Sequence, residues 1–504
     1  MKKLIDTFDK KTKIIATFGP AITDNLWSLK DLTLTKNKKA VAQAYSNVEQ
    51  LINAGMSCAR LNFSHGTYEE QLLRIKIIRD VAKKLNKHIP IILDTKGPEI
   101  RLGKFNSKVP VPIGTQLEIY TTKDIIGNSK KFSVNTTTPN YNMINDIKVG
   151  SIILVDDGKL RLLVTKIDKS KNIITAVAQN SHYISERKRI NLPDADYTMP
   201  FLSEKDKQDI QFACDNKLDI IALSFVNNAA NVEAIRDILA KNNSQNIQII
   251  SKIETKNAIK NLDKIIDVSD GIMVARGDLS LEIPYWEVPY WEEQIISKTR
   301  SQGKLSIVAT QMLDSLEHNI QPTRAEVTDV YYAVKLGADA TMLSGETANG
   351  DFPVNALQTM SNIDVYAESR FNYWNAYIKF LRNKSFPQYA KSIGVKIAKK
   401  ILPNDKHLGI TSKYQSLVIF SDDKLLIKAI SNLRPIVPTI LVTSEKELLN
   451  YYGIYYGIQT YLVNDLNKAK EKYEQVVKDI FKTSKLKKLS LVYMNKKLYE
   501  IYFF

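Results

Sequence analysis

Eight short apolar runs, each ending in polar or charged residues, set the strongest limit on the fold of this chain. They cover residues 13–19, 57–64, 90–97, 219–225, 247–254, 271–276, 305–311 and 338–345. Helical periodicity separates most of them, at 47–54, 68–85, 204–217, 231–241, 287–302 and 324–336. Apolar strands that alternate with helices are typical of a parallel sheet buried on both faces. Eight such units predict an α/β protein built on a TIM (β/α)8 barrel.

The third and fourth runs are separated by a segment with a different pattern. From 98 to 197 apolar and polar residues alternate, and Asp157-Gly158 is a strong hairpin signal. This segment is predicted to form a small β-barrel domain inserted at a loop of the larger barrel. Loops that follow barrel strands lie at the catalytic face, so the inserted domain is predicted to act as a lid.

A third region follows the barrel. Apolar runs at 416–420, 438–442, 459–463 and 489–493 alternate with helical stretches, and a long basic helix is expected over 467–488. This alternation predicts an open α/β sheet. We therefore expect the barrel in residues 1–97 and 198–365, the lid in 98–197 and the C-terminal domain in 366–504.

The composition is that of a protein in a reducing, aqueous compartment. No apolar run approaches the roughly 20 residues that a membrane-spanning helix needs, and the N-terminus carries no apolar signal segment. Cys58 and Cys214, the only two cysteines, lie in apolar contexts typical of reduced core residues. We predict a cytoplasmic protein without a membrane partner.

The formal net charge of +17 raises the question of nucleic acid binding. Residues 366–504 hold 24 Lys and Arg against 11 Asp and Glu, so thirteen of the seventeen excess charges lie there. The lysines are scattered and lack the interleaved aromatics of a single-strand binder. We interpret them as a solvated surface and do not expect a nucleic acid partner.

Charged residues gather at the ends of two neighbouring strands in residues 249–284. Lys252 and Glu254 are two apart, so on a strand both side chains leave the same face, and the next run breaks at Arg276-Gly277-Asp278. One interpretation is a buried ion pair that ties two loops together. The other is a divalent cation held by two carboxylates, with a lysine beside it to neutralise a phosphoryl group or an enolate.

A set of motifs then extends this interpretation. The chain contains ATFGPA (16–21), CARLNFSHG (58–66), ILDTKGPEIRLG (92–103), NLPDADYTMPFLSEKD (191–206), ISKIET (250–255), VARGDLSLEIP (274–284), ATQMLDS (309–315), PTRAEVTDV (322–330) and MLSGETANG (342–350). In this order and spacing, across residues 11 to 365, they resemble the motifs of the pyruvate kinase family. The resemblance implies the same three domains and transfer of a phosphoryl group from phosphoenolpyruvate to ADP, giving pyruvate and ATP.

The resemblance also implies roles for individual residues. Glu254 and Asp278 would hold Mg²⁺ (or Mn²⁺), while Lys252 and Arg60 would bind the phosphoryl group. A K⁺ ion would be held by Asn62, Ser64, Asp94 and the carbonyl of Thr95. Glu99 implies that K⁺ is required, because a lysine at this place goes with independence of K⁺.

The remaining roles concern the enolate and the nucleotide. Thr310, with Ser344 and Glu346 behind it, would belong to the network that delivers the proton, and the N–H groups of Gly277 and Asp278 would bind the substrate carboxylate. The nucleotide would meet Asn62, His65 and Lys188 beside Arg60. Arg101 and Ser224 are weaker candidates for this site, and Glu99 could also form an ion pair with Arg101.

Three features depart from the family pattern. Ser280 replaces a glycine, and residues 22–45 form a longer insertion than usual. The turn expected to cradle the phosphate of a sugar bisphosphate reads Ser421-Asp422-Asp423-Lys424, with two carboxylates and no glycine. We therefore predict that fructose 1,6-bisphosphate does not activate through this turn.

Two alternative functions are compatible with parts of the sequence. Another barrel enzyme that uses Mg²⁺ and an enolate would share the fold but not the K⁺ and nucleotide residues. A scaffold protein using the basic C-terminal domain on RNA would show salt-sensitive RNA affinity and no turnover. The family resemblance implies a homotetramer.

Overall fold

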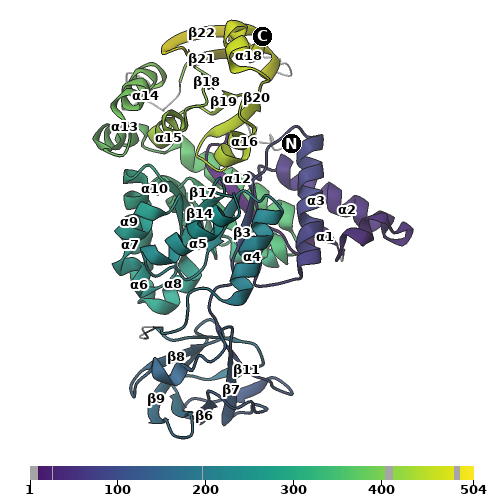
Figure 1. Cartoon of the computed structure of the whole chain (residues 1–504), viewed down its shortest axis with the longest axis vertical. Coiled ribbons are helices and arrows are strands. Elements are labelled where there is room, and N and C mark those ends of the chain that lie inside the picture. The colour runs from purple at the N-terminus through teal and green to yellow at the C-terminus, as the bar shows by residue number, and fades with distance from the viewer. Residues whose placement is uncertain are drawn as a thin grey trace.

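A computed structural model describes residues 9–24, 26–193, 195, 197–402, 412–481 and 488–503. Three bodies are stacked along its longest axis, as Figure 1 shows. The large barrel lies in the middle, the small β-barrel at one end and the C-terminal sheet at the other. No helix among the described residues is long and apolar enough to cross a membrane.

The central body is a closed barrel of eight parallel strands. In chain order these are β1 (Lys13–Thr17), β2 (Cys58–Asn62), β3 (Ile91–Asp94), β13 (Ile220–Leu223), β14 (Gln248–Ile253), β15 (Gly271–Ala275), β16 (Leu305–Ala309) and β17 (Ala340–Leu343). The sheet closes where β1 pairs with β17, Lys13 opposite Ala340. Nearly every strand residue is buried, as expected for strands covered on both faces. The predicted α/β barrel is confirmed.

Helices cover the barrel. They are α1 (Pro20–Thr23), α2 (Lys38–Asn53), α3 (Tyr68–Lys84), α4 (Glu204–Asp215), α5 (Ala229–Lys241), α6 (Lys256–Lys260), α7 (Leu262–Val268), α8 (Arg276–Glu282), α9 (Val288–Ser301), α10 (Arg324–Leu336), α11 (Gly345–Ala348) and α12 (Pro353–Ser369). Thr67 with Glu70 and Thr323 with Glu326 form capping boxes that fix the starts of α3 and α10. One boundary was wrong: α2 begins at Lys38, nine residues before the predicted 47, so helix occupies part of the predicted insertion.

The inserted segment forms a second closed barrel, which confirms the predicted lid fold. Its strands are β4 (Ile100–Leu102), β6 (Gln116–Tyr120), β7 (Lys131–Thr136), β8 (Ile152–Val155), β9 (Leu160–Asp168), β10 (Ile173–Ala178) and β12 (Arg189–Asn191); β5 (Val109–Val111) and β11 (His182–Ile184) form a separate pair. The predicted Asp157-Gly158 turn joins β8 to β9, with Asp156, Asp157 and Gly158 all at positive φ.

The C-terminal body is a five-stranded sheet in the order β20-β19-β18-β21-β22. Its elements are α13 (Tyr373–Arg382), α14 (Gln388–Ile401), β18 (Ser416–Phe420), α15 (Lys424–Leu433), β19 (Thr439–Thr443), α16 (Lys446–Gly453), β20 (Ile458–Leu462), α17 (Leu466–Glu471), α18 (Tyr473–Ile480), β21 (Lys488–Met494) and β22 (Lys497–Phe503). The predicted long basic helix is instead two short helices broken at Lys472. Strand β22, which we did not predict, returns antiparallel to β21.

The C-terminal body closes the amino-terminal end of the large barrel. Side chains of the barrel interior, such as Ile15 and Ile250, share one apolar cluster with Leu448 and Tyr452 of α16. A buried ion pair reinforces the contact. Arg434 Nη1 lies 2.7 Å from Asp339 Oδ1, and the side chains are only 1% and 4% exposed. The carboxyl ends of the strands therefore remain open only toward the lid.

Candidate active site between barrel and lid

A cavity of about 310 Å³ lies at the carboxyl ends of the barrel strands, beneath the lid. The strand ends and their loops supply most of its wall, and the lid supplies the rest. Ten of the predicted site residues line it: Arg60, Asn62, Ser64, His65, Asp94, Thr95, Lys188, Lys252, Glu254 and Asp278. Gly277, Thr310, Ser344 and Glu346 are not part of this lining. The predicted site residues of β2, β3, β14 and β15 therefore meet in one place.

Lys252 leaves the end of β14 and is almost fully buried in this cavity. Its Nζ donates to Asp94 Oδ1 at 3.1 Å and to Ser224 Oγ at 2.8 Å, and it lies 2.9 Å from Glu254 Oε1. Burial opposes the charge, but Asp94 and Glu254 hold the pKa of Lys252 above its ordinary value. The amine is therefore a fixed positive charge at neutral pH.

Arg60, at the end of β2, lies across Asp94 from Lys252. Its Nε donates to Asp94 Oδ2 at 2.7 Å and its Nη1 to Thr17 Oγ1 at 2.9 Å. Burial would raise the pKa of Asp94, but the two cations outweigh it and keep that pKa below its ordinary value. One buried carboxylate thus positions both cations, and together they carry a net positive charge.

Two carboxylates that could hold a metal ion flank the lysine. Glu254 is 1% exposed, and its Oε2 accepts from Phe225 N at 2.7 Å. Its Oε1 is buried and has no hydrogen bond of good geometry, although it lies near Lys252. Asp278 stands at the start of α8 and forms an ion pair with Arg189 of the lid. Hard oxygen donors of this kind suit Mg²⁺, which often takes only one or two carboxylates and completes its shell with water and phosphate.

No group of three or more His, Cys, Asp or Glu side chains with the geometry of a metal site occurs in the part of the chain that the structure describes. These residues therefore do not form a complete metal coordination shell from protein ligands alone. The pair Glu254 and Asp278 instead fits a cation that shares its coordination shell with a bound phosphate.

The backbone after β16 is held in an unusual conformation. Thr310 and Gln311 have φ of 70° and 52°, which is strained for a β-branched residue such as threonine. Arg276 stabilises this turn because its Nη2 donates to the carbonyl of Thr310 at 2.9 Å and to that of Gln311 at 3.2 Å. As a result Thr310 Oγ1 accepts from Gly277 N at 2.8 Å, beside Asp278.

Ser344 and Glu346 lie after β17, next to the loop that follows Thr310. Glu346 is buried, and its carboxylate accepts from Ser344 N at 2.6 Å and from Leu313 N at 3.1 Å. Burial raises the pKa of Glu346. Ser344 Oγ is buried without a hydrogen-bond partner, so it is available to a water molecule or a substrate atom.

The residues predicted to hold K⁺ surround the same cavity. Asn62 Oδ1 accepts from Ser64 N at 3.0 Å, and Ser224 Oγ donates to the carbonyl of Thr95 at 2.7 Å. With Asp94 they offer amide, hydroxyl, carbonyl and carboxylate oxygens, which are ligands that a hard cation accepts.

The predicted nucleotide residues lie at the open side. His65 is exposed, and Lys188 of the lid lies 2.9 Å from Asp156 Oδ1. Glu99 pairs with Arg101 through two contacts of 2.9 Å and 2.8 Å, the alternative noted for it from the sequence. His65 of the barrel and Lys188 of the lid thus line the same opening, where the charge of Lys188 is balanced by Asp156.

Two positions gained importance only from the structure. Arg276 holds the Thr310 turn, and its position next to Gly277 and Asp278 in the sequence was the one feature that could have marked it as a site residue. Arg189 binds Asp278 across the cleft, and nothing in the sequence pattern marked it. The departure at Ser280 is accommodated locally, because its Oγ donates to the carbonyl of Gly277 at 2.7 Å.

Comparison with known proteins agrees with this geometry. Residues 9–357 match a family model described as pyruvate kinase, barrel domain. The chain is 47% identical over 468 residues to a pyruvate kinase of Mycoplasma pneumoniae, covering 92% of both proteins. It is 38% identical to one of Bacillus licheniformis over 89% of this chain and 71% of that protein.

A solved structure extends the similarity to nearly the whole fold. The crystal structure of a pyruvate kinase from Cryptosporidium parvum superposes with a TM-score of 0.83 at 33% sequence identity, covering 99% of this chain and 97% of that one. The chain therefore belongs to the pyruvate kinase family, and it catalyses the last step of glycolysis, the transfer of a phosphoryl group from phosphoenolpyruvate to ADP.

Proposed function

We propose that the phosphoryl group passes through the cavity between Lys252 and the Glu254–Asp278 carboxylate pair. The observation that carries this proposal is the position of Lys252, whose charged amine is fixed by Asp94 and Ser224 in the wall of the cavity. Phosphoryl transfer asks the protein mainly for positioning and for neutralisation of charge. A buried, immobile cation supplies both without reorganising during the reaction.

Glu254 and Asp278 would hold Mg²⁺ (or Mn²⁺), which supplies a Lewis acid for phosphate oxygens when bound. Arg60 would bind the same phosphoryl group from the opposite side, since Asp94 already orients its guanidinium. Asn62, Ser64, Asp94 and Thr95 would hold K⁺. Each of these side chains lines the cavity, which supports assigning both cations to it.

The enolate left after transfer needs a proton. We assign its delivery to the group around Thr310, supported by Ser344 and Glu346. A hydroxyl is too weak an acid to act alone near neutral pH, but the raised pKa of the buried Glu346 suits it to hold a proton that reaches the enolate through hydroxyls and water. Gly277 and Asp278 would orient the substrate carboxylate with their N–H groups. The Gly277 N–H is bonded to Thr310 Oγ1 here, so that bond would have to be exchanged on substrate binding.

ADP would bind at the open rim, against Asn62, His65 and Lys188. This assignment is supported by the position of Lys188 on the lid, which would add a positive charge above the nucleotide phosphates when the lid closes.

We also propose that the enzyme is a cytoplasmic homotetramer. Its two cysteines are unpaired, as expected in a reducing compartment. Tyr285 and Trp286, in a short 3-10 helix just before α9, and Tyr290, in the first turn of α9, are 73%, 68% and 58% exposed. Such a cluster of aromatic side chains is typical of a subunit contact.

The central experiment is a coupled assay of pyruvate formation with Lys252→Met, a change of similar length that removes the charge. We expect kcat to fall roughly a thousandfold or more, because a fixed charge beside the travelling group is lost. Lys256→Met is the matched control, since Lys256 is an exposed lysine only four residues away. A Lys252→Met enzyme that kept a rate within a factor of a few of the wild type would contradict the proposal.

A further inference from the structure

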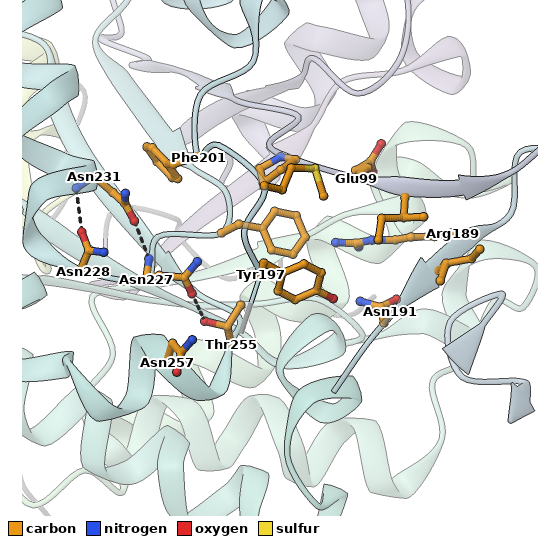
Figure 2. A pocket seen from close by; sticks show the side chains of 15 residues that line it. Glu99, Arg189, Asn191, Tyr197, Phe201, Asn227, Asn228, Asn231, Thr255 and Asn257 are labelled. Carbon is orange, nitrogen blue, oxygen red and sulfur yellow. Dashed lines mark hydrogen bonds between the residues drawn. The ribbon is translucent and has the colours of Figure 1, made fainter. Parts of the chain in front are cut away.

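Arg189 links the lid to the catalytic carboxylates. It lies on β12, a lid strand that also pairs with β4 and β8. Figure 2 shows its side chain reaching from this strand into the cleft between lid and barrel. There the guanidinium forms an ion pair with Asp278, which belongs to the barrel. This contact joins the two bodies at one of the two proposed metal ligands.

The guanidinium is held by more than its charge. It lies over the ring of Phe225, 4.8 Å from the ring centre. The backbone N–H of the same Phe225 donates to Glu254, the other proposed ligand. The side chains of Arg189 and Asp278 are only 17% and 22% exposed, so water screens their attraction weakly.

The charges around Arg189 also favour this contact. A guanidinium keeps its charge at physiological pH, and Arg189 shares the cavity with the carboxylates of Asp278, Glu254 and Glu99. Arg189 therefore brings one positive charge from the lid to Asp278 and Glu254, two carboxylates of the barrel that would otherwise repel each other. A divalent cation would supply two charges to the same oxygens.

We propose that Arg189 and the divalent cation compete for Asp278, so that metal binding releases the contact between lid and barrel. This inference rests on the proposed metal site. Arg189 is a positioning residue in this scheme, since it acts through Asp278 and through the lid. In the metal-free enzyme the Arg189–Asp278 ion pair holds the lid against the barrel. In the metal-bound enzyme this ion pair is broken, and β12 can move with the substrate.

The direct test measures binding of Mn²⁺ alone, without substrate, by electron paramagnetic resonance or calorimetry. Arg189→Gln removes the competing charge, and we expect Mn²⁺ to bind about tenfold more tightly, the equivalent of roughly 1.4 kcal/mol. Arg189→Lys, which keeps the charge but loses the planar fork, should lie between the two. Arg161→Gln is the matched control, because Arg161 is an exposed arginine on the lid strand β9 and is not among the residues that line the cavity. It should bind Mn²⁺ as the wild type does.

Asp278→Asn separates this inference from the function on which it rests. If Asp278→Asn binds Mn²⁺ as tightly as the wild type, the proposed metal site itself is wrong. If that variant loses Mn²⁺ while Arg189→Gln binds it no more tightly than the wild type, the metal site stands and the competition is overturned.

Hydrogen exchange gives a second readout, which can be taken on the wild type itself. Addition of Mn²⁺ to the wild type should speed amide exchange in 189–193 and 98–103, where the lid joins the barrel. In Arg189→Gln these amides should already exchange faster without metal and should change little on its addition. Unchanged or slower exchange in the wild type on adding Mn²⁺ would overturn the proposal, even if Arg189→Gln failed to fold.

Discussion

At the scale of single residues, the environment of Glu99 bears on the proposed K⁺ requirement. Glu99 is 6% exposed and is bonded to Arg101, with Lys96 3.4 Å away. Its charge is thus already balanced by protein groups. The proposed monovalent cation would lie beside Asn62 and Asp94, which line the same cavity, where phosphate charge would accumulate.

We predict that the wild-type enzyme needs K⁺. Replacing K⁺ with tetramethylammonium should lower the rate of pyruvate formation about tenfold or more, because one charge that stabilises the transferring group is lost. Glu99→Lys should recover much of the rate in tetramethylammonium, since its ammonium can take the place of the ion. Full wild-type activity without K⁺ would refute the assignment. Glu118→Lys, the same change of charge at an exposed position of the lid strand β6 that does not line the cavity, should leave the requirement intact.

The roles at strand ends were predictable because parallel barrel strands bring their carboxyl ends together. Lys252, Glu254 and Asp94 were therefore expected at one face of the barrel before their distances were known, whereas their roles, and the assignment of Arg60, came from the family resemblance. Arg189 was not, because its partner Asp278 is 89 residues away and belongs to another body. A sequence pattern shows which residues share a face of one helix or strand, whereas this contact depends on how the lid is positioned relative to the barrel.

At the scale of elements, the start of α15 shows why the usual phosphate turn is altered here. Asp423 Oδ1 accepts from Leu425 N at 2.9 Å and from Leu426 N at 3.1 Å. Asp422 bonds to Thr443 and Ser444. The amides that would meet a phosphate are already satisfied by a carboxylate, which also repels an anion.

We therefore predict that fructose 1,6-bisphosphate does not shift the saturation curve for phosphoenolpyruvate. Steady-state rates across a phosphoenolpyruvate series, with and without the sugar, test this directly. A clear shift to lower phosphoenolpyruvate concentrations would show that the sugar binds despite the carboxylates. Repeating the series with Asp423→Ser, which keeps a helix cap but removes the charge, shows whether the carboxylate alone excludes the sugar.

Element types were predicted better than element ends. Strand β16 was expected to run through Gln311 but stops at Ala309, because Arg276 draws the next two carbonyls into a left-handed turn. The basic helix of the C-terminal body was expected to be continuous but breaks at Lys472. In both cases the sequence pattern indicated the correct type of element, but tertiary contacts or local backbone geometry ended that element earlier than the pattern did.

At the scale of the whole molecule, the exposed aromatic cluster of Tyr285, Trp286 and Tyr290 bears on assembly. We predict a tetramer by light scattering coupled to size exclusion. Trp286→Glu should give a smaller species, because a charge would be buried in an apolar contact. Tyr183→Glu on the lid, 56% exposed, is the matched control and should leave the mass unchanged. A wild-type monomer at micromolar concentration would contradict the assignment.

The contact between the C-terminal body and the barrel should contribute strongly to stability. Arg434→Met leaves Asp339 buried without its partner and should lower the free energy of unfolding by about 3–5 kcal/mol. The exposed Lys76–Asp80 pair, with side chains 53% and 37% exposed, provides the control. Lys76→Met should cost less than about 1 kcal/mol. Urea unfolding followed by tryptophan fluorescence measures both, and equal losses would disprove the special role of the buried pair.

The insertion of the lid between β3 and β13 also orders events during synthesis. The barrel cannot close until β17 has emerged, because β1 pairs with it. All strands of the lid are complete by Asn191, about 150 residues earlier. Since nascent chains fold as units from the N-terminus, the lid should be folded on the ribosome while the first three strands of the barrel still wait for their partners.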